Sequence, residues 1–289
     1  MPQGGRTTVR SRRLGRELKD ARVKSGQSQE DAATALLCNA SKISRIESGH
    51  VSARPLEVVT LLRLYGVVDD PARVKRLEEL ARVSSKRGWW LDYEAIPNGY
   101  ADQISLEDDA THISEWGSAL IPGLCQSPKY AQKTIENGPN FVPPDQIKEL
   151  VEVRKRRQRL ISTEGIYYAA TLWECAVTTP AWGLEVHEDQ LKHLLSLTEQ
   201  SNITIQILPM REIAAATLTG PFSAYAFSEE PAFEAVRVSN AMNTTVLESG
   251  SDLTAYSRIY DRLRSAALSQ DQSAKLIRNI LGNLNKGQT

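Results

Sequence analysis

The sequence predicts an all-helical domain followed by an α+β domain with a mostly antiparallel sheet of about four to five strands. The chain has 289 residues, which is about the length of two domains. Apolar residues recur at helical spacing in the first third, whereas short segments rich in β-branched and aromatic residues follow from residue 165. The charged residues are also unevenly distributed. Residues 1–90 hold 18 basic and 10 acidic side chains, whereas the remainder holds 17 basic and 25 acidic side chains. A basic first third indicates contact with a polyanion, and chance clustering of charges on solvated faces is the alternative.

The first domain is expected over residues 12–86, after a Gly-, Arg- and Ser-rich tail over residues 1–11 that is predicted to be disordered. Apolar residues from Leu14 onward mark the face of the first helix. Ile43 and Ile46 lie on one face of the third helix and should be buried. Five helices are bounded by caps, turn glycines and helix-opening prolines at Gly26, Ser28, Asn39, Gly49, Arg54-Pro55 and Asp70-Pro71.

The segment RGWWLDYEAIPNGY interrupts the helical period and predicts a Trp-rich connector over residues 87–104 that docks onto the second domain. Its aromatic residues are interpreted as packing residues in preference to a platform for stacking bases. The α+β domain follows over residues 105–289. Its helices are expected at about 106–115, 127–137, 143–161, 187–200, 251–267 and 271–282. Its strands are expected at 165–173, 202–209, 221–228 and 234–240, with a fifth candidate at 242–249.

No segment of the sequence predicts a membrane span or a secretory signal. No apolar run approaches the roughly 20 residues that cross a bilayer, and no apolar segment follows the N-terminal arginines. The three cysteines, Cys38, Cys125 and Cys175, are far apart and odd in number, which predicts neither a disulfide framework nor a metal site. Together these features predict a cytoplasmic protein.

No residue pattern typical of an enzyme is present, and the sequence predicts no cofactor. The glycines form neither a phosphate-binding loop nor a dinucleotide-binding turn, and no nucleophile elbow occurs. His187 and His193 are six residues apart on one predicted helix, so they lie on different faces and should not share a metal ion. The basic run RKRRQR, residues 154–159, is interpreted as a solvated helix face, with a second nucleic-acid patch or a site for an acidic partner as alternatives.

Residues 28–49 predict a pair of short helices of the kind that reads DNA. A helix-turn-helix needs a first helix that braces the phosphate backbone and a second whose N-terminal residues reach base edges. Gln29 begins the first helix and can donate to phosphate, and Arg45 of the second can read guanine in the major groove. A generic helical hairpin is the alternative. The full set of predicted DNA-contacting residues is Gln29, Asn39, Ala40, Ser41, Lys42, Ser44 and Arg45.

The stretch LGRELKDARVKSGQSQEDAATALLCNASKISRIESG, followed by RPLEVVTLLRLYGV, resembles the XRE (lambda-repressor-like) DNA-binding domain. The rest of the chain resembles actinobacterial regulators with an Scr antitoxin-like (WhiJ-like) C-terminal domain, on the motifs RGWW, ALIPGLCQSPKYA, RKRRQRL, NITIQILP, TGPFSAYAF and YDRLRSAALS. The resemblance implies a buried ion pair between Arg22 and Glu47. It also implies that Ala40, Ser41 and Arg45 contact bases. Gln29 would occupy the position near phosphate.

Two departures from the family pattern affect what the resemblance implies. Leu37 occupies the turn position that is usually glycine, and a leucine there is costly if the backbone has a positive φ. The region before GPF reads AAATLT, without the histidine that relatives often carry, so no role of that histidine is carried over.

The resemblance implies a cytoplasmic transcription regulator that acts on double-stranded DNA and whose C-terminal domain binds a small partner protein. A homodimer is expected, because one short helix-turn-helix reads only a few base pairs and a second copy on a palindrome supplies the remaining specificity. A one-component regulator whose C-terminal domain senses a small molecule is the second hypothesis. An enzyme fused to a DNA-binding module is the third.

Overall fold

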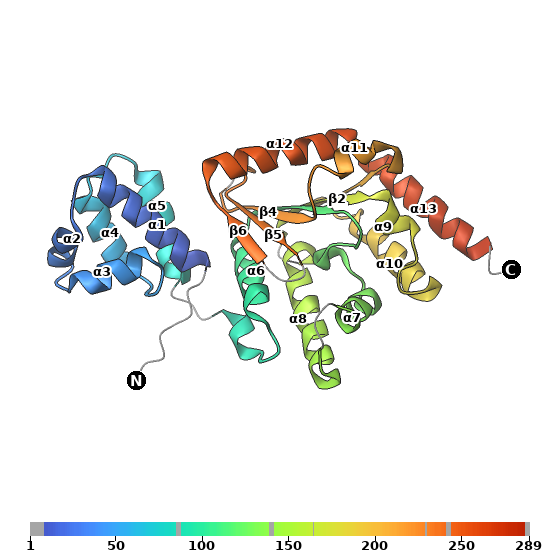
Figure 1. The fold of residues 1–289 in the computed structure, drawn as a ribbon, viewed down its shortest axis with the longest axis horizontal. Coiled ribbons are helices and arrows are strands. Elements are labelled where there is room, and N and C mark those ends of the chain that lie inside the picture. The colour runs from blue at the N-terminus through green and yellow to red at the C-terminus, as the bar shows by residue number, and fades with distance from the viewer. Residues whose placement is uncertain are drawn as a thin grey trace. The chain divides into compact units, whose positions relative to one another are not determined.

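The chain divides into two compact units, Met1–Asp92 and Tyr93–Thr289. Figure 1 shows helices alone in the first unit and helices around a β-sheet in the second. The predicted order of fold classes, all-helical and then α+β, therefore agrees with the structure. A computed structural model describes residues 9–84, 88–138, 142–163, 165–228, 230–240 and 244–286.

Short helices build the first unit. They are α1 (Val9–Lys24), α2 (Gln29–Ala35), α3 (Ala40–Glu47), α4 (Pro55–Leu64), α5 (Pro71–Ser84) and the 3-10 helix η1 (Trp89–Asp92). Disorder was the wrong prediction for residues 9–11, which begin α1, while residues 1–8 lie outside the described part of the chain. The cause is packing, because Ser11 is buried and its Oγ donates to the carbonyl oxygen of Gly49 at 2.7 Å. Trp90 is buried, and the Arg10 guanidinium of the same unit lies 5.8 Å from the centroid of its ring.

The core of the first unit includes a close crossing of α1 and α3. At Gly15 of α1, an added Cβ would lie 2.4 Å from the carbonyl oxygen of Ile46, so only glycine permits this approach. Ile43 and Ile46 are both buried, and each such side chain contributes about 1.5–3 kcal/mol to folding. The buried residues packed around them include Leu14, Leu18, Val58, Leu61, Leu62 and Leu77.

One six-stranded sheet forms the centre of the second unit, as far as its described residues show, in the order β3-β2-β1-β4-β5-β6. The strands are β1 (His112–Gly117), β2 (Tyr167–Trp173), β3 (Ile203–Leu208), β4 (Phe222–Ala226), β5 (Ala235–Ser239) and β6 (Thr244–Leu247). Strand β1 pairs in parallel with β2, and β2 with β3. Strand β4 pairs antiparallel with β1 and with β5, and β5 pairs antiparallel with β6. The predicted mostly antiparallel sheet of four to five strands is therefore wrong, because the sheet is mixed and has six strands.

The strand absent from the prediction is β1, which lies in a stretch predicted as a helix over residues 106–115. Helix α6 (Asn98–Asp109) begins inside the predicted connector and ends before β1. The sequence conceals β1 because Glu115 is buried at a position where the alternation of a strand normally places an apolar residue. Helical crossovers follow β1 and β2, and such crossovers are what parallel pairing requires.

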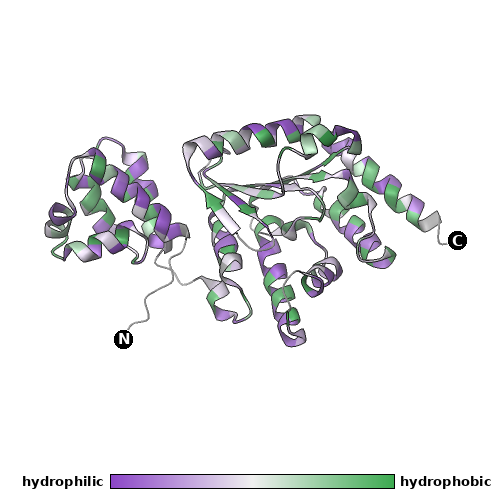
Figure 2. Cartoon of the chain, viewed as in Figure 1, coloured by the Kyte–Doolittle hydropathy of each residue, from purple (hydrophilic) through white to green (hydrophobic). Residues whose placement is uncertain are grey.

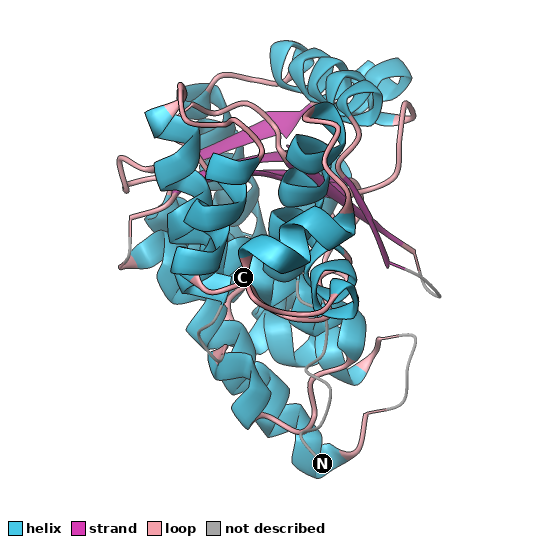
Figure 3. Ribbon diagram, turned by 90° about the vertical axis from the view of Figure 1, so that its left-hand side faces the viewer, coloured by secondary structure: helices cyan, strands magenta, loops and turns pink. Residues whose placement is uncertain are grey.

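Helices cover both faces of the sheet. Helix α12 (Gly250–Ala266) lies over one face, and α6 and α8 (Pro144–Ser162) lie over the other (Figure 1). Figure 3 shows the strands beneath the helices at the top of the view, and Figure 2 shows hydrophobic and hydrophilic faces on the helices, as burial of one face requires. The other elements are η2 (Gly123–Cys125), α7 (Pro128–Glu136), α9 (Glu174–Thr178), α10 (Leu184–Leu197), η3 (Met210–Glu212), α11 (Ile213–Ala216) and α13 (Gln270–Lys286). Among the described residues, no helix has both the length and the apolar composition to cross a membrane.

Candidate nucleic-acid interface

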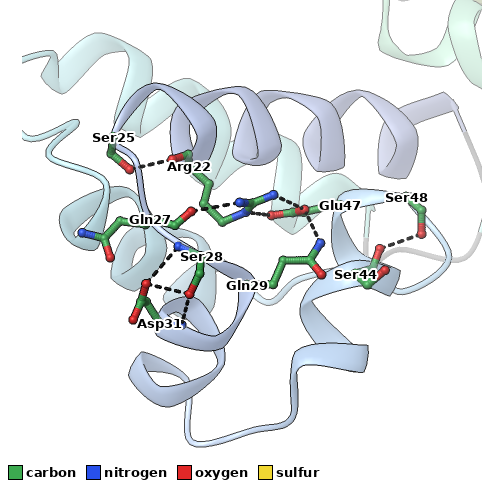
Figure 4. A network of polar contacts seen from close by, with 9 residues as sticks. All are labelled: Arg22, Ser25, Gln27, Ser28, Gln29, Asp31, Ser44, Glu47 and Ser48. Atoms are coloured by element: carbon green, nitrogen blue, oxygen red, sulfur yellow. Dashed lines mark hydrogen bonds and ion pairs between the residues drawn. The ribbon is translucent and has the colours of Figure 1, made fainter.

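Two capped helices, α2 and α3, form the helix-turn-helix segment of the first unit. Ser28 Oγ accepts a hydrogen bond from the Asp31 amide at 3.1 Å, and the Asp31 carboxylate accepts one from the Ser28 amide at 2.9 Å (Figure 4). Asn39 caps α3, because its Oδ1 accepts from the Lys42 amide at 2.9 Å. Caps of this kind each contribute about 1 kcal/mol, so both helices begin at defined residues.

The turn between these helices places Leu37 in the left-handed region of the backbone, with φ of 51°. For a residue with a Cβ this conformation costs roughly 1–2 kcal/mol. The Leu37 side chain is 95% exposed, so packing does not offset that cost. The Cys38 amide still donates to the Ala33 carbonyl oxygen at 2.9 Å, which closes the turn. The backbone thus has the form that glycine adopts without strain.

Helix α3 has a buried apolar face and a polar face toward solvent. Arg45 lies on the polar face, and its guanidinium has no polar partner in the described part of the chain. Its planar fork is therefore free to bind a guanine edge or a phosphate. Of the other predicted contact residues in and before this helix, the exposed ones are Asn39, Ser41 and Ser44, and the half-buried ones are Ala40 and Lys42.

Lys42 takes part in an ion pair that the sequence pattern did not predict. Its Nζ lies 2.5 Å from Oε1 of Glu57, and the other oxygen of Glu57 accepts from the Arg54 amide at 2.8 Å. The pair joins α3 to the first turn of α4. The Lys42 charge is therefore partly neutralised at the surface where a contact with DNA was predicted.

A largely buried ion pair joins α1 to the end of α3 (Figure 4). Arg22 Nε and Nη2 donate to the two carboxylate oxygens of Glu47 at 2.6 and 3.0 Å, and its Nη1 donates to the Gln27 carbonyl oxygen at 2.9 Å. The Arg22 and Glu47 side chains are 12% and 4% exposed. Burial, together with the nearby Glu47 charge, raises the pKa of Tyr65 to about 12.

Gln29 is oriented by this ion pair. Its Nε2 donates to Glu47 Oε2 at 2.8 Å, which uses one of the two N–H groups of the amide (Figure 4). The second N–H and the side-chain oxygen remain for another contact. The arrangement holds Gln29 at the start of α2, where a phosphate contact was predicted, and links that position to the packing of α1 against α3.

Two family models match the chain. Residues 13–77 match the model described as a helix-turn-helix domain, and residues 100–279 match the model described as a domain of unknown function (DUF5753). The second match spans more than half of the chain. The chain belongs to the DUF5753 family. No curated protein and no solved structure matches it. The helix-turn-helix match contains every predicted DNA-contacting residue and supports a DNA-binding regulator.

The DUF5753 domain contains a buried ion pair between α6 and α8. Arg157 Nε and Nη2 each donate to the Glu107 carboxylate at 2.6 Å, and both side chains are 1% exposed. The Tyr100 hydroxyl accepts from Arg157 Nη1 at 2.7 Å and from Arg154 Nε at 3.2 Å. Burial raises the pKa of Tyr100 and the two guanidinium charges lower it, with a net lowering.

The interpretation of residues 154–159 as a solvated helix face is therefore wrong for part of this basic run. Arg157 is buried against Glu107, and Arg154 is half-buried against Tyr100. Only part of the DUF5753 domain's basic run faces solvent, namely Lys155, Arg156 and Arg159.

Proposed function

We propose that this chain is a sequence-specific transcription regulator of the XRE type, in which α3 enters the major groove of double-stranded DNA. The helix-turn-helix match supports DNA binding. The observation that carries sequence-specific reading is the exposed Arg45 guanidinium on the polar face of α3. The excess of basic residues in the first 90 positions supplies attraction to phosphate. Such a regulator acts in the cytoplasm, on the nucleoid.

In this arrangement the first turn of α3 lies nearest the bases. Ala40 and Ser41 belong to that turn, and Arg45 follows one helical turn later and reaches a guanine edge through two hydrogen bonds. Gln29 contacts phosphate through its remaining N–H group, and Lys42 exchanges Glu57 for the DNA backbone. Asn39 and Ser44 flank these contacts.

Two substitutions test this docking orientation. Arg45→Ala is expected to lose about 1–3 kcal/mol of discrimination at one base-pair position, because base contacts carry sequence identity. Gln29→Ala is expected to weaken binding to all sequences alike, because phosphate contacts carry no information about base sequence. The binding site is obtained by selection from random duplexes, and each variant is then titrated against a series of its single-base changes.

Arg63→Ala is the matched control, because it removes an exposed arginine from the end of α4. It should leave the discrimination intact. Uniform weakening by Arg45→Ala, combined with relaxed specificity at one position in Gln29→Ala, would show that the orientation is wrong.

We also propose that the chain is a homodimer and that its DUF5753 domain binds a small partner protein, as antitoxin-like regulators do. The dimer follows from the few base pairs that one helix-turn-helix reads. The partner surface is supported by the resemblance to WhiJ-like regulators and by apolar side chains on and after η3 that are 38–55% exposed. These side chains are Met210, Ile213 and Leu218.

Purification of the full chain from its native cells tests the partner. A small protein recovered in equal amount with the unchanged chain, and lost from Ile213→Glu, is the expected result. Leu184→Glu changes another exposed apolar residue of the same unit and serves as the control. Equal recovery with Ile213→Glu would contradict a partner surface at this patch.

Sensing of a small molecule is the second candidate for the DUF5753 domain, because this domain contains a cavity lined by converging polar groups. Mass spectrometry of the small molecules that the purified chain releases on denaturation separates the two candidates. One released metabolite per chain favours sensing, whereas a co-purified protein without a metabolite favours the partner.

A further inference from the structure

A cavity of about 250 Å³ lies at the carboxyl end of β1, between the sheet and α8. Strand β1 is the point where the sheet changes direction, since it pairs in parallel with β2 on one side and antiparallel with β4 on the other. The strand order also reverses at β1, because β2 and β3 lie on one side of it and β4 lies on the other. Ligands of open α/β sheets bind beyond the carboxyl ends of strands where the order reverses. The volume corresponds to about eight water molecules of roughly 30 Å³ each, which suits a small metabolite and not a peptide.

One row of side chains across three strands lines the cavity. Glu115 of β1 is paired with Ser223 of β4, and Ser223 is paired with Arg237 of β5. Paired residues of neighbouring strands share a face of the sheet, so these three side chains point to the same side. Arg154 and Arg157 of α8 line the cavity from the other wall. The cavity therefore brings three guanidinium groups and one carboxyl group together.

The two arginines of α8 differ in how their charge is balanced. Arg157 donates from all three guanidinium nitrogens, to Glu107 and to Tyr100, and is neutralised within the domain. Arg154 donates to the Tyr100 hydroxyl and to the Gln126 side-chain oxygen, which carry no formal charge. Within the described residues, no carboxylate accepts a hydrogen bond from Arg154. Its positive charge therefore remains available to the cavity.

Arg237 supplies an unsatisfied donor in the same wall. Its Nε is shielded from solvent and has no acceptor among the residues that the structure describes. A buried donor on a cation is costly to leave unpaired, and native structures leave few such groups. Arg237 therefore lines the cavity with a guanidinium group whose Nε has no acceptor among the described residues.

Glu115 offsets at most one of the two guanidinium charges, those of Arg154 and Arg237, that line this cavity beside the neutralised Arg157. Its two oxygens accept from the Tyr168 hydroxyl at 2.5 Å and from Ser223 Oγ at 2.7 Å. Burial raises the pKa of the Glu115 carboxyl, which favours its uncharged form. The cavity wall is therefore positive, and its acceptor is expected to be an anion.

We propose that this cavity binds a small organic carboxylate, held by Arg237 and Arg154. A guanidinium fork matches the two coplanar oxygens of a carboxylate, and a single negative charge suits a wall that also contains Glu115. A phosphate dianion would meet stronger repulsion when Glu115 is ionised. This inference deepens the small-molecule candidate proposed above for the DUF5753 domain and rests on it. It is independent of how α3 reads DNA, so the failure of either of these two proposals leaves the other standing.

The test uses the full chain and a panel of sodium carboxylates: acetate, pyruvate, succinate, glutamate and benzoate. Sodium phosphate and sodium chloride at the same ionic strength are the comparison salts. At least one carboxylate is expected to raise the melting temperature and to give a saturable calorimetric titration, whereas the comparison salts do neither. Arg237→Gln should weaken the titrated affinity at least about tenfold, because it removes charged hydrogen bonds. Arg211→Gln, an exposed arginine of the same unit, should leave the affinity unchanged.

Arg237→Lys is the second variant, because it keeps the charge while it removes the fork, and it should also weaken binding. Circular dichroism confirms that each variant is folded before titration. The proposal is overturned if no carboxylate of the panel binds, if phosphate binds equally well, or if folded variants at Arg237 bind as tightly as the unchanged chain.

Discussion

Removal of the Glu47 carboxylate is expected to cost the first unit about 3 kcal/mol of folding free energy. This carboxylate accepts two hydrogen bonds from Arg22 and one from Gln29, and the paired side chains are largely buried. Loss of one partner from a buried ion pair costs about 3–5 kcal/mol, because the other charge remains unpaired. Arg22 keeps 12% exposure and its bond to the Gln27 carbonyl oxygen, which places Glu47→Ala at the lower end of that range.

Denaturant unfolding of the full chain measures this cost. Arg22→Ala, Glu47→Ala and the double variant form a cycle whose coupling energy isolates the pair. Hydrogen exchange in peptides from α1 and α3 assigns the loss to the first unit. A loss of about 3 kcal/mol in a unit of this size lowers its melting temperature by roughly 12–24 °C.

Arg82→Ala is the matched control, because Arg82 forms exposed pairs on its own helix with Glu79 and Glu78 at 3.0 and 3.2 Å. Exposed pairs contribute only about 0–1 kcal/mol, so this variant should change little. Single losses below about 1 kcal/mol at Arg22 and Glu47, which simply add in the double variant, would refute the reasoning from burial.

Leu37→Gly should stabilise the first unit by roughly 0.5–1 kcal/mol in thermal melts, because glycine adopts the positive φ without the cost of a Cβ, whereas Leu37→Ala should be nearly neutral. Burial raises the pKa of Glu115, so the folded chain keeps a proton there that the unfolded chain releases near pH 4.5. The free energy of unfolding should therefore fall as pH rises from that value through the raised pKa, and denaturation of Glu115→Gln should lack this decline. Glu57→Gln should release Lys42 to phosphate and steepen the log–log salt dependence of DNA binding by about 0.9, and an unchanged slope would contradict this. Light scattering should give a dimer, and a mass of 32.1 kDa at every concentration, with and without DNA, would exclude one.

The helices of the first unit are predictable because their signals are local. Ser28 and Asn39 act on amides within three residues, and Pro55 opens α4 at its first position. The ion pair between Arg22 and Glu47 joins residues 25 positions apart, and only the family resemblance implied it. Sequence patterns therefore reveal contacts between residues that are close along the chain, such as helix caps, but not contacts between distant residues, such as this ion pair.

The sheet was mispredicted because strand direction depends on connections and on a strand that the pattern hides. The predicted strands near residues 203 and 222 lie where the structure has β3 and β4. Without β1 the prediction lacked the strand that joins the parallel half of the sheet to the antiparallel half. Glu115 caused this error, because a buried carboxylate breaks the alternation by which strands are found.

In the candidate site, too, local spacing was predictable and contacts between distant residues were not. Arg45 was found as an outward-facing residue from helical spacing alone. The partner of Lys42, Glu57, is 15 positions away on another helix, and the partner of Arg157, Glu107, is 50 positions away. Arginines are seldom fully buried, so a run of basic residues is normally interpreted as surface, and here one member carries a buried ion pair.

Strand β1 is synthesised long before its antiparallel neighbour. Strand β4 follows it by roughly 100 residues, which take about 5–20 s at ribosomal speeds. During that interval one edge of β1 has no strand to pair with, and an open edge invites pairing with other chains. A carboxylate that points inward from the strand, such as that of Glu115, discourages a foreign strand from adding there. We therefore expect the residue that hides β1 in the sequence to reduce aggregation of the nascent chain as well.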